Sequence, residues 1–162
     1  MTAQAHLDRI QMVNQGSFYT PNSIVCLVYQ MLLDSKINIK DYVSLDSSCG
    51  YGSFLNLEGF KQNIGADIDS VALLKAKAYF KDSYMKPLFI HTNALADVQR
   101  NKFKITESDK LIIIGNPPYN DKTSIVQNHL KSTDSNPVDS YLKARDIGIS
   151  FLRSFDILKA DY

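Results

Sequence analysis

The chain has 162 residues, of which 44% are hydrophobic and 22% are charged, and its formal net charge is +1. This composition excludes a disordered chain and predicts one domain with a sizeable core. The charge neither requires nor excludes a nucleic-acid partner, because groove binding depends on where Lys and Arg cluster.

The cysteine content and the start of the chain bear on its compartment. Cys26 and Cys49 form no CxxC pair, so we expect neither a metal site nor a disulfide framework, and a reducing cytoplasm is the expected location. The first ten residues have no basic or apolar segment of a secretion signal, and no apolar run approaches the roughly 20 residues that span a bilayer. We therefore expect a soluble, cytoplasmic protein with no membrane partner.

Hydrophobic periodicity divides the chain into alternating helices and strands. Thr20 and Pro21 are predicted as the N-cap and first residue of a helix that ends near Asp34. Strands are predicted over 41–46, 63–69, 87–93 and 110–116, and helices from the turn after the first strand to about 62, over 70–79 and over 147–160. This is an α/β pattern, which we divide into a helical segment 1–40, a sheet region 41–120, a polar loop 121–146 and a terminal helix 147–162.

A glycine-rich turn follows the first strand in "LDSSCGYGSF" (45–54). Gly50 and Gly52 let a ligand approach the backbone N–H groups at the start of the next element. Leu55 stands where a dinucleotide site needs a third small residue, so a nucleoside without a pyrophosphate fits better. Asp67, at the end of the second strand, is predicted to accept hydrogen bonds from ribose hydroxyls, and Asp69 to cap the following helix.

The segment "IIIGNPPYND" (112–121) ends the fourth strand with two prolines, which cannot donate to a sheet. An adenine amino group is a poor nucleophile because its lone pair is delocalised into the ring. The side-chain oxygen of Asn116 and the carbonyl of Pro117 could accept its two N–H groups and favour a pyramidal nitrogen, while Pro117 and Pro118 stiffen the turn. Tyr119 offers a face on which an extruded base can stack.

The order FYTP (18–21), DSSCGYGSF (46–54), GADID (65–69) and NPPY (116–119) resembles the amino-terminal catalytic region of gamma-class adenine-N6 DNA methyltransferases, which use S-adenosylmethionine. The resemblance covers roughly residues 16–160 and implies a doubly wound, Rossmann-like methyltransferase fold. It implies that the target base is held by Asn116, Pro117, Pro118 and Tyr119. It implies a cofactor site formed by Tyr19, Thr20, Pro21, Asp46, Ser48, Cys49, Gly50, Gly52, Asp67, Ile68, Asn93, Ala94 and Asn116.

Within that site, the resemblance places Thr20 and Pro21 near the methionine part of the cofactor and Asp46 near its amino group. Asn93 stands where the family often has an acid that holds the cofactor's adenine amino group. An Asn carbonyl can accept the same bond without a charge. The partner implied is double-stranded DNA, in the setting of restriction and modification.

Two alternatives stay open from the sequence. A similar NPPY turn occurs in methyltransferases that modify the glutamine amide of release factors, although those enzymes tend to carry an RPET-like segment where this chain has FYTP. The chain could also be a noncatalytic or split subunit that binds the cofactor or a partner chain.

The chain stops soon after its last predicted helix, so we expect a methyltransferase sheet truncated after the fourth strand, without a target-recognition domain and inactive alone. In the expected strand order 3-2-1-4-5, the strand "LIIIG" (111–115) then lacks its neighbour on one side. An unpaired apolar strand is a template for another chain. We therefore expect a homodimer, a second subunit that completes the sheet, or aggregation.

Overall fold

The computed structural model describes residues 20–118 and 137–162. Tyr19, Tyr119 and most of the predicted polar loop 121–146 lie outside these residues. In chain order the elements are α2 (Asn22–Asp34), η1 (Ile39–Asp41), β1 (Tyr42–Asp46), η2 (Ser53–Asn56), β2 (Gln62–Asp67), α3 (Ser70–Tyr79), β3 (Leu88–His91), η3 (Arg100–Phe103), β4 (Lys110–Ile113) and α5 (Ile147–Ile157). Among the described helices, none is long and apolar enough to cross a membrane.

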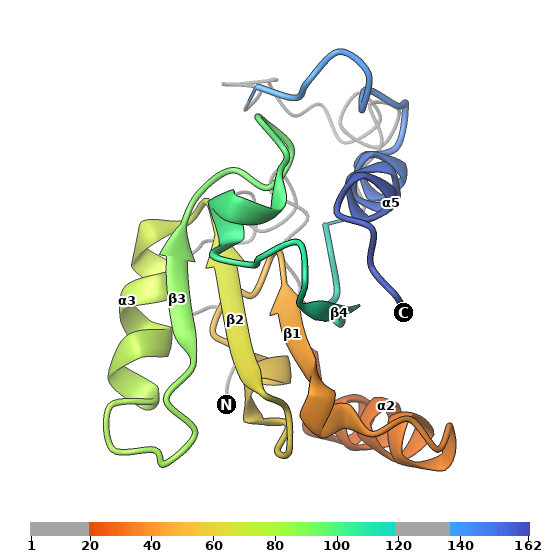
Figure 1. The fold of residues 1–162 in the computed structure, drawn as a ribbon. Helices are drawn as coiled ribbons and strands as arrows, with labels where there is room; N and C mark the ends of the chain where they lie inside the picture. Colours follow the sequence, from red (N-terminus) through yellow and green to blue (C-terminus); the bar gives the residue numbers. More distant parts are fainter. Residues whose placement is uncertain (1–19, 119–136) are drawn as a thin grey trace.

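The four strands form one parallel sheet in the order β3-β2-β1-β4 (Figure 1). Leu45 of β1 is in register with Ile64 of β2 on one side and Ile113 of β4 on the other. This is the predicted order for the first four strands, and it confirms the doubly wound α/β fold. Because all strands run the same way, their carboxyl ends meet at one edge, where ligands bind in open sheets of this kind.

Side chains from alternate strand positions build two cores on opposite faces of the sheet. On one face, Val43, Leu45 and Leu111 pack with Phe103 from the β3–β4 connection and Phe151 of α5. On the other face, the side chains belong to two neighbouring clusters. One joins Tyr42, Ile112 and Ile114 to Val25 of α2, and the other joins Cys49 and Leu55 to Leu73 of α3. Helices therefore cover both faces of the sheet. This was predicted from the strands, in which apolar and polar residues do not alternate.

The predicted helix from the glycine-rich turn to about residue 62 is wrong. Only one 3-10 turn forms, from Ser53 to Asn56, and β2 begins at Gln62. Asn63 supplies the physical reason, because its buried amide donates to the carbonyls of Leu57 at 2.9 Å and Leu55 at 3.5 Å. Those carbonyls would accept backbone N–H groups if the helix continued.

The start of α2 also differs from the prediction by one residue. Pro21 is the N-cap, not the first helical residue, because its ψ of 145° is extended, and the helix begins at Asn22. Thr20 therefore precedes the cap of this helix. Its hydroxyl is available for another contact.

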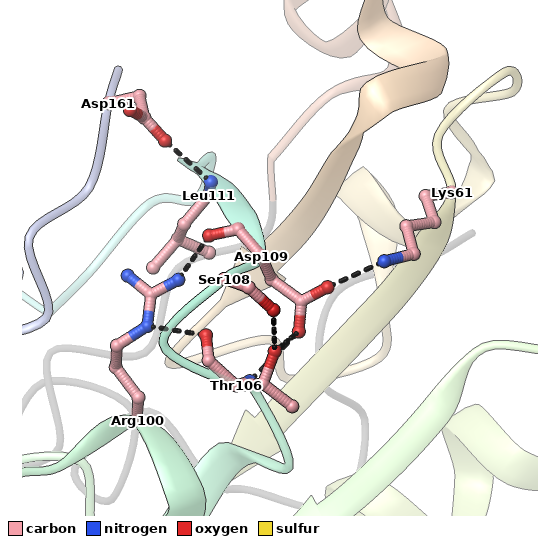
Figure 2. A network of polar contacts seen from close by, with 7 residues as sticks. All are labelled: Lys61, Arg100, Thr106, Ser108, Asp109, Leu111 and Asp161. Atoms are coloured by element: carbon pink, nitrogen blue, oxygen red, sulfur yellow. Dashed lines mark hydrogen bonds and ion pairs between the residues drawn. The ribbon is translucent and has the colours of Figure 1, made fainter.

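The outer edge of β4 is not open, contrary to the prediction. The N–H of Asp161 donates to the carbonyl of Leu111 at 2.8 Å, and Ile113 N donates to the carbonyl of Tyr162 at 2.9 Å. The Asp161 carboxylate also accepts from Leu111 N at 2.8 Å (Figure 2). After α5 the chain turns at Lys159, which has a φ of 51°, and runs back along this strand (Figure 1).

Arg100 links this returning segment to the β3–β4 connection by hydrogen bonds. Its guanidinium donates to the carbonyls of Thr106 at 3.0 Å, Leu158 at 2.7 Å and Lys159 at 3.4 Å, and also to that of Asp109. Figure 2 shows it beside the network in which Asp109 binds Lys61 and Thr106. The sequence pattern did not indicate this side chain, because a lone Arg in a loop resembles any surface cation.

Candidate active site

The glycine-rich turn is tied to the end of β2 by the Asp67 carboxylate. One oxygen accepts the N–H of Gly50 at 2.7 Å, and the other accepts the N–H of Asp69 at 2.8 Å. The turn needs glycine, because φ is 51° at Gly50 and 82° at Gly52. Asp67 therefore lies beside the turn, as predicted, and it orders the backbone there before any ligand binds.

The helix after β2 begins as the sequence predicted. The Asp69 side chain accepts from Val71 N at 2.9 Å and Ala72 N at 3.1 Å, which makes it the N-cap of α3. Asp67 and Asp69 thus have separate roles. The Asp69 carboxylate caps α3, whereas the Asp67 carboxylate accepts a hydrogen bond from the glycine-rich turn.

Asp46, at the end of β1, is a buried carboxylate with few donors. It is 4% exposed, and among the described residues it accepts one hydrogen bond, from Ser48 N at 3.2 Å. Burial raises the pKa of Asp46 to about 7, despite the Ser48 bond that lowers it, and the charge of Asp67 adds to the rise. A carboxylate in this setting is stabilised by a cation that enters the site.

Gly115 makes room for Asp46 where β4 ends. A Cβ at Gly115 would lie 2.6 Å from Oδ1 of Asp46. Any other residue would therefore displace the carboxylate or the chain that leads to Asn116. Gly115 is not among the predicted site residues, although its place between an apolar strand and the Asn-Pro-Pro turn is a usable signal.

Two further titratable groups at this edge, Asp67 and Cys49, are affected by burial, and Ile68 follows Asp67 in the chain. Burial also raises the pKa of Asp67, against hydrogen bonds from Asp69 N and Gly50 N that lower it. Burial likewise raises the pKa of the Cys49 thiol, which packs into the core below the turn. Ile68 is 42% exposed, so its side chain offers an apolar surface next to Asp67.

His91 is a residue near this edge that the sequence analysis missed. Its Nε2 lies 2.9 Å from the carbonyl oxygen of Ile68, so the end of β3 supports the turn after β2. The backbone does the same, because Thr92 N donates to Asp67 O at 2.9 Å. A polar residue at the end of an apolar strand is the signal that could have found it.

Asn93 and Ala94, which were predicted to contact the cofactor, also have contacts within the protein itself. The Asn93 side-chain oxygen accepts Leu95 N at 2.9 Å, and its Nδ2 donates to Pro137 O at 2.6 Å. Ala94 is 5% exposed and packs in the core. The amide of Asn93 thus holds its own turn to residue 137, and its oxygen has one lone pair left for a ligand.

The two sequence motifs at the ends of the resemblance meet in space. Nδ2 of Asn116 donates to Oγ1 of Thr20 at 3.3 Å. Pro117 and Pro118 follow as half-buried residues, and Ile114 N still bonds the carbonyl of Leu45 at 3.0 Å, which anchors the turn to β1. The structure thus brings Thr20, Asp46, Gly115 and Asn116 to the same strand ends.

The carboxyl-end site is distinct from two hollows on the surface of the described residues. One, of about 480 Å³, is lined by residues of 141–157, and the other, of about 490 Å³, by residues 99–107. Neither contains a residue of the predicted site. Among the described residues, no group of three His, Cys, Asp or Glu side chains could hold a metal ion.

The solved structures that share this fold include two proteins related to methylation. A putative class I S-adenosylmethionine-dependent methyltransferase from Listeria monocytogenes is 17% identical with a TM-score of 0.60, and the match covers 91% of this chain and 44% of that one. A modification subunit of a putative type I restriction enzyme from Vibrio vulnificus is 20% identical with a TM-score of 0.54, and covers 85% of this chain and 30% of that one. This chain thus spans less than half of either neighbour.

The comparison with models of protein families finds no match, and neither does the search of curated proteins. At these identities the solved structures define the fold alone. The chain has the Rossmann-like fold found in S-adenosylmethionine-dependent methyltransferases, as predicted.

Proposed function

We propose that this chain binds S-adenosylmethionine at the carboxyl ends of β1, β2 and β4 and carries the catalytic turn of an adenine-N6 DNA methyltransferase. The observation that carries the proposal is the buried Asp46 carboxylate, which accepts one hydrogen bond from the described residues. Structural polar groups at 4% exposure are normally satisfied by the protein. Asp46 instead suits the positively charged amino group of a ligand.

The surrounding residues fit the rest of this cofactor. The Asp67 oxygens each accept one backbone N–H, and a carboxylate has about four acceptor positions, so ribose hydroxyls can add to it. Gly50 and Gly52 let a nucleoside approach the turn, and exposed Ile68 offers an apolar contact to a base. A bound cofactor would supply an electrophilic methyl group on a sulfonium; transfer to the acceptor nitrogen would leave a thioether and release one amine proton to solvent.

The chain's own contribution to that reaction would come from the Asn-Pro-Pro turn. Asn116 Oδ1 and Pro117 O are two acceptors on a stiffened backbone, suited to the two N–H groups of an amine that must become pyramidal. Pro117 and Pro118 fix them before the substrate arrives. Tyr119, which lies outside the described residues, stays the predicted stacking partner for the target base.

The proposal that DNA is the substrate rests on the NPPY motif and on the Vibrio vulnificus neighbour, which is a modification subunit of a putative type I restriction enzyme. We propose double-stranded DNA as the partner of the complete enzyme, in the cytoplasm.

Calorimetric titration of the whole chain with S-adenosylmethionine and with its demethylated product tests the cofactor proposal. We expect both to bind, and we expect Asp46→Asn to weaken binding about tenfold or more, because it removes a charge-assisted hydrogen bond. Asp82→Asn is the matched control, since Asp82 is exposed in the connection between α3 and β3. A folded chain that binds neither nucleoside at millimolar concentration would overturn the proposal, and binding of NAD instead would indicate an oxidoreductase.

The substrate proposal is tested by transfer of a labelled methyl group in a preparation that contains any required partner chain. We expect label on the adenine amino group of duplex DNA, and its loss in Asn116→Ala with little change in cofactor affinity. Label on a release-factor peptide but not on DNA would support the glutamine-amide alternative. Cofactor binding without transfer to either substrate would favour a noncatalytic subunit.

A further inference from the structure

One described side chain holds the amide of Asn116, and that side chain is Thr20. The hydrogen bond from Nδ2 to Oγ1 is 3.3 Å long and joins residues 96 positions apart in the chain. Thr20 is 8% exposed, whereas Asn116 is an exposed residue. The contact therefore links a buried hydroxyl to a side chain on the surface of the proposed site.

The position of Thr20 is fixed by the packing of α2 against β4. The carbonyl of Pro21 accepts Ile24 N at 3.0 Å and Val25 N at 3.2 Å, so the residue after Thr20 is tied into the first turn of the helix. Val25 is 3% exposed and packs with Ile112 and Ile114, at the end of the strand that leads to Asn116. The hydroxyl of Thr20 is thus held in place relative to the Asn-Pro-Pro turn.

The orientation of the Asn116 amide decides what it offers to a substrate. With Nδ2 directed at Thr20, Oδ1 points the other way and, among the described residues, accepts no hydrogen bond. A reversed amide would present two N–H donors, which cannot accept from a substrate amine. Because a hydroxyl can accept or donate, Asn116 offers an acceptor to an amine as long as Thr20 Oγ1 accepts from its Nδ2.

We propose that Thr20 is a positioning residue that holds the Asn116 amide with Oδ1 facing the amine that receives the methyl group. The resemblance to methyltransferases already places Thr20 near the cofactor. The present proposal gives it a second role, which is to orient the catalytic turn. The role in transfer rests on the proposed function, whereas the contact and the orientation do not. The two can therefore fail separately.

Nuclear magnetic resonance of the whole chain tests the orientation, with the side-chain amide signal of Asn116 assigned by its loss in Asn116→Asp. We expect a nuclear Overhauser contact between the Nδ2 protons and the methyl group of Thr20, because the amide nitrogen faces that residue. The absence of this contact in a folded chain would overturn the proposal.

Substitution of Thr20 tests the hydroxyl itself. Thr20→Val keeps the shape and removes the hydroxyl, and we expect the Asn116 signal to move and its hydrogen exchange to quicken by about 2- to 10-fold, the equilibrium constant of one hydrogen bond. Thr20→Ser keeps the hydroxyl and should retain the original signal and rate. Thr20→Ala gives the same comparison if the valine variant does not fold.

Identical Asn116 signals and exchange rates in the threonine, serine and hydroxyl-free forms would overturn the inference. A backbone spectrum that matches the original chain is the control for the fold. If the amide responds to Thr20 but S-adenosylmethionine does not bind, the proposed function fails and the positioning contact stands. If the cofactor binds and the amide does not respond, the inference alone fails.

Discussion

Asp46 and Arg100 are both charged and almost fully buried, at 4% and 7% exposure, but the protein treats them in opposite ways. The Arg100 guanidinium donates to four carbonyl oxygens, from Thr106, Leu158, Lys159 and Asp109. The Asp46 carboxylate accepts one N–H, that of Ser48, from the described residues. The Arg100 charge is paired within the fold, whereas the Asp46 carboxylate has one donor among the described residues.

We interpret this difference as the one between a structural buried charge, Arg100, and the acid for which we propose a binding role, Asp46. Arg100 offsets its desolvation by joining the β3–β4 connection to the residues that follow α5, and so it holds the chain against the edge of β4. Asp46 offsets little of its own desolvation, and its raised pKa is the consequence. A poorly satisfied acid at the carboxyl ends of parallel strands is what a binding site for a cationic group requires.

Loss of the Arg100 side chain should have the largest effect on stability. Arg100→Met leaves four carbonyls without their donor, and we expect a loss of roughly 3 kcal/mol or more in the free energy of unfolding, or about 6–12 °C in melting temperature. Thermal unfolding followed by circular dichroism measures it. Lys77→Met, on the exposed side of α3, is the matched control and should change little. An equal, small effect of both variants would show that Arg100 is not structural.

Loss of the Asp46 charge should act in the opposite direction, with a sign that depends on pH. The folded state holds the Asp46 proton up to a pKa of about 7, and the unfolded state releases it near its ordinary value of 3.8. The folded state therefore binds more protons between these values, so this group lowers stability as pH rises through that window. Asp46→Asn should match the original chain near pH 4 and exceed it by roughly 2–4 kcal/mol at pH 8.

Chemical denaturation of both forms at pH 4, 6 and 8 measures this difference. Asp82→Asn controls for the loss of an exposed acid and should show no such trend. A variant that is less stable than the original chain at pH 8 would mean that Asp46 is satisfied within the fold. That result would contradict the difference between Asp46 and Arg100 on which the comparison rests.

The Lys61–Asp109 ion pair should matter least, although it belongs to the network around Arg100. Its nitrogen and oxygen are 2.6 Å apart, but the Lys61 side chain is 58% exposed. We expect Lys61→Met to cost less than about 1 kcal/mol at low salt and less again at high salt, because solvent and ions screen an exposed charge. Urea denaturation at two salt concentrations measures it. A cost as large as that of Arg100→Met would contradict this ranking.

The fold, and the position of the predicted site residues at one edge of the sheet, could be predicted because they depend on local pattern. Apolar strands that end in Asp46, Asp67 and Asn116 require those residues to meet at one edge once the sheet is parallel. The cap at Asp69 followed from its position before a helix, and the structure confirms it. The strand order of the four strands followed from the same fold class.

What could not be predicted depends on contacts between distant residues. The helix after the glycine-rich turn fails because Asn63 captures its carbonyls, and the β4 edge is covered because Arg100 holds the returning chain. Neither interaction leaves a periodic signal in the sequence. The contact of Thr20 with Asn116 and the degree of burial of Asp46 are likewise properties of the packed molecule.

Proton release on cofactor binding tests the central claim, which is that Asp46 binds a cationic group of the cofactor. At pH 6 Asp46 is mostly protonated, with a pKa of about 7, and an ammonium group should bind its ionised form. Calorimetric titration with S-adenosylmethionine in buffers of different ionisation enthalpy counts the protons released. The account predicts close to one proton per cofactor at pH 6, and almost none in Asp46→Asn. Tight binding with no proton release, or equal release in the variant, would contradict it.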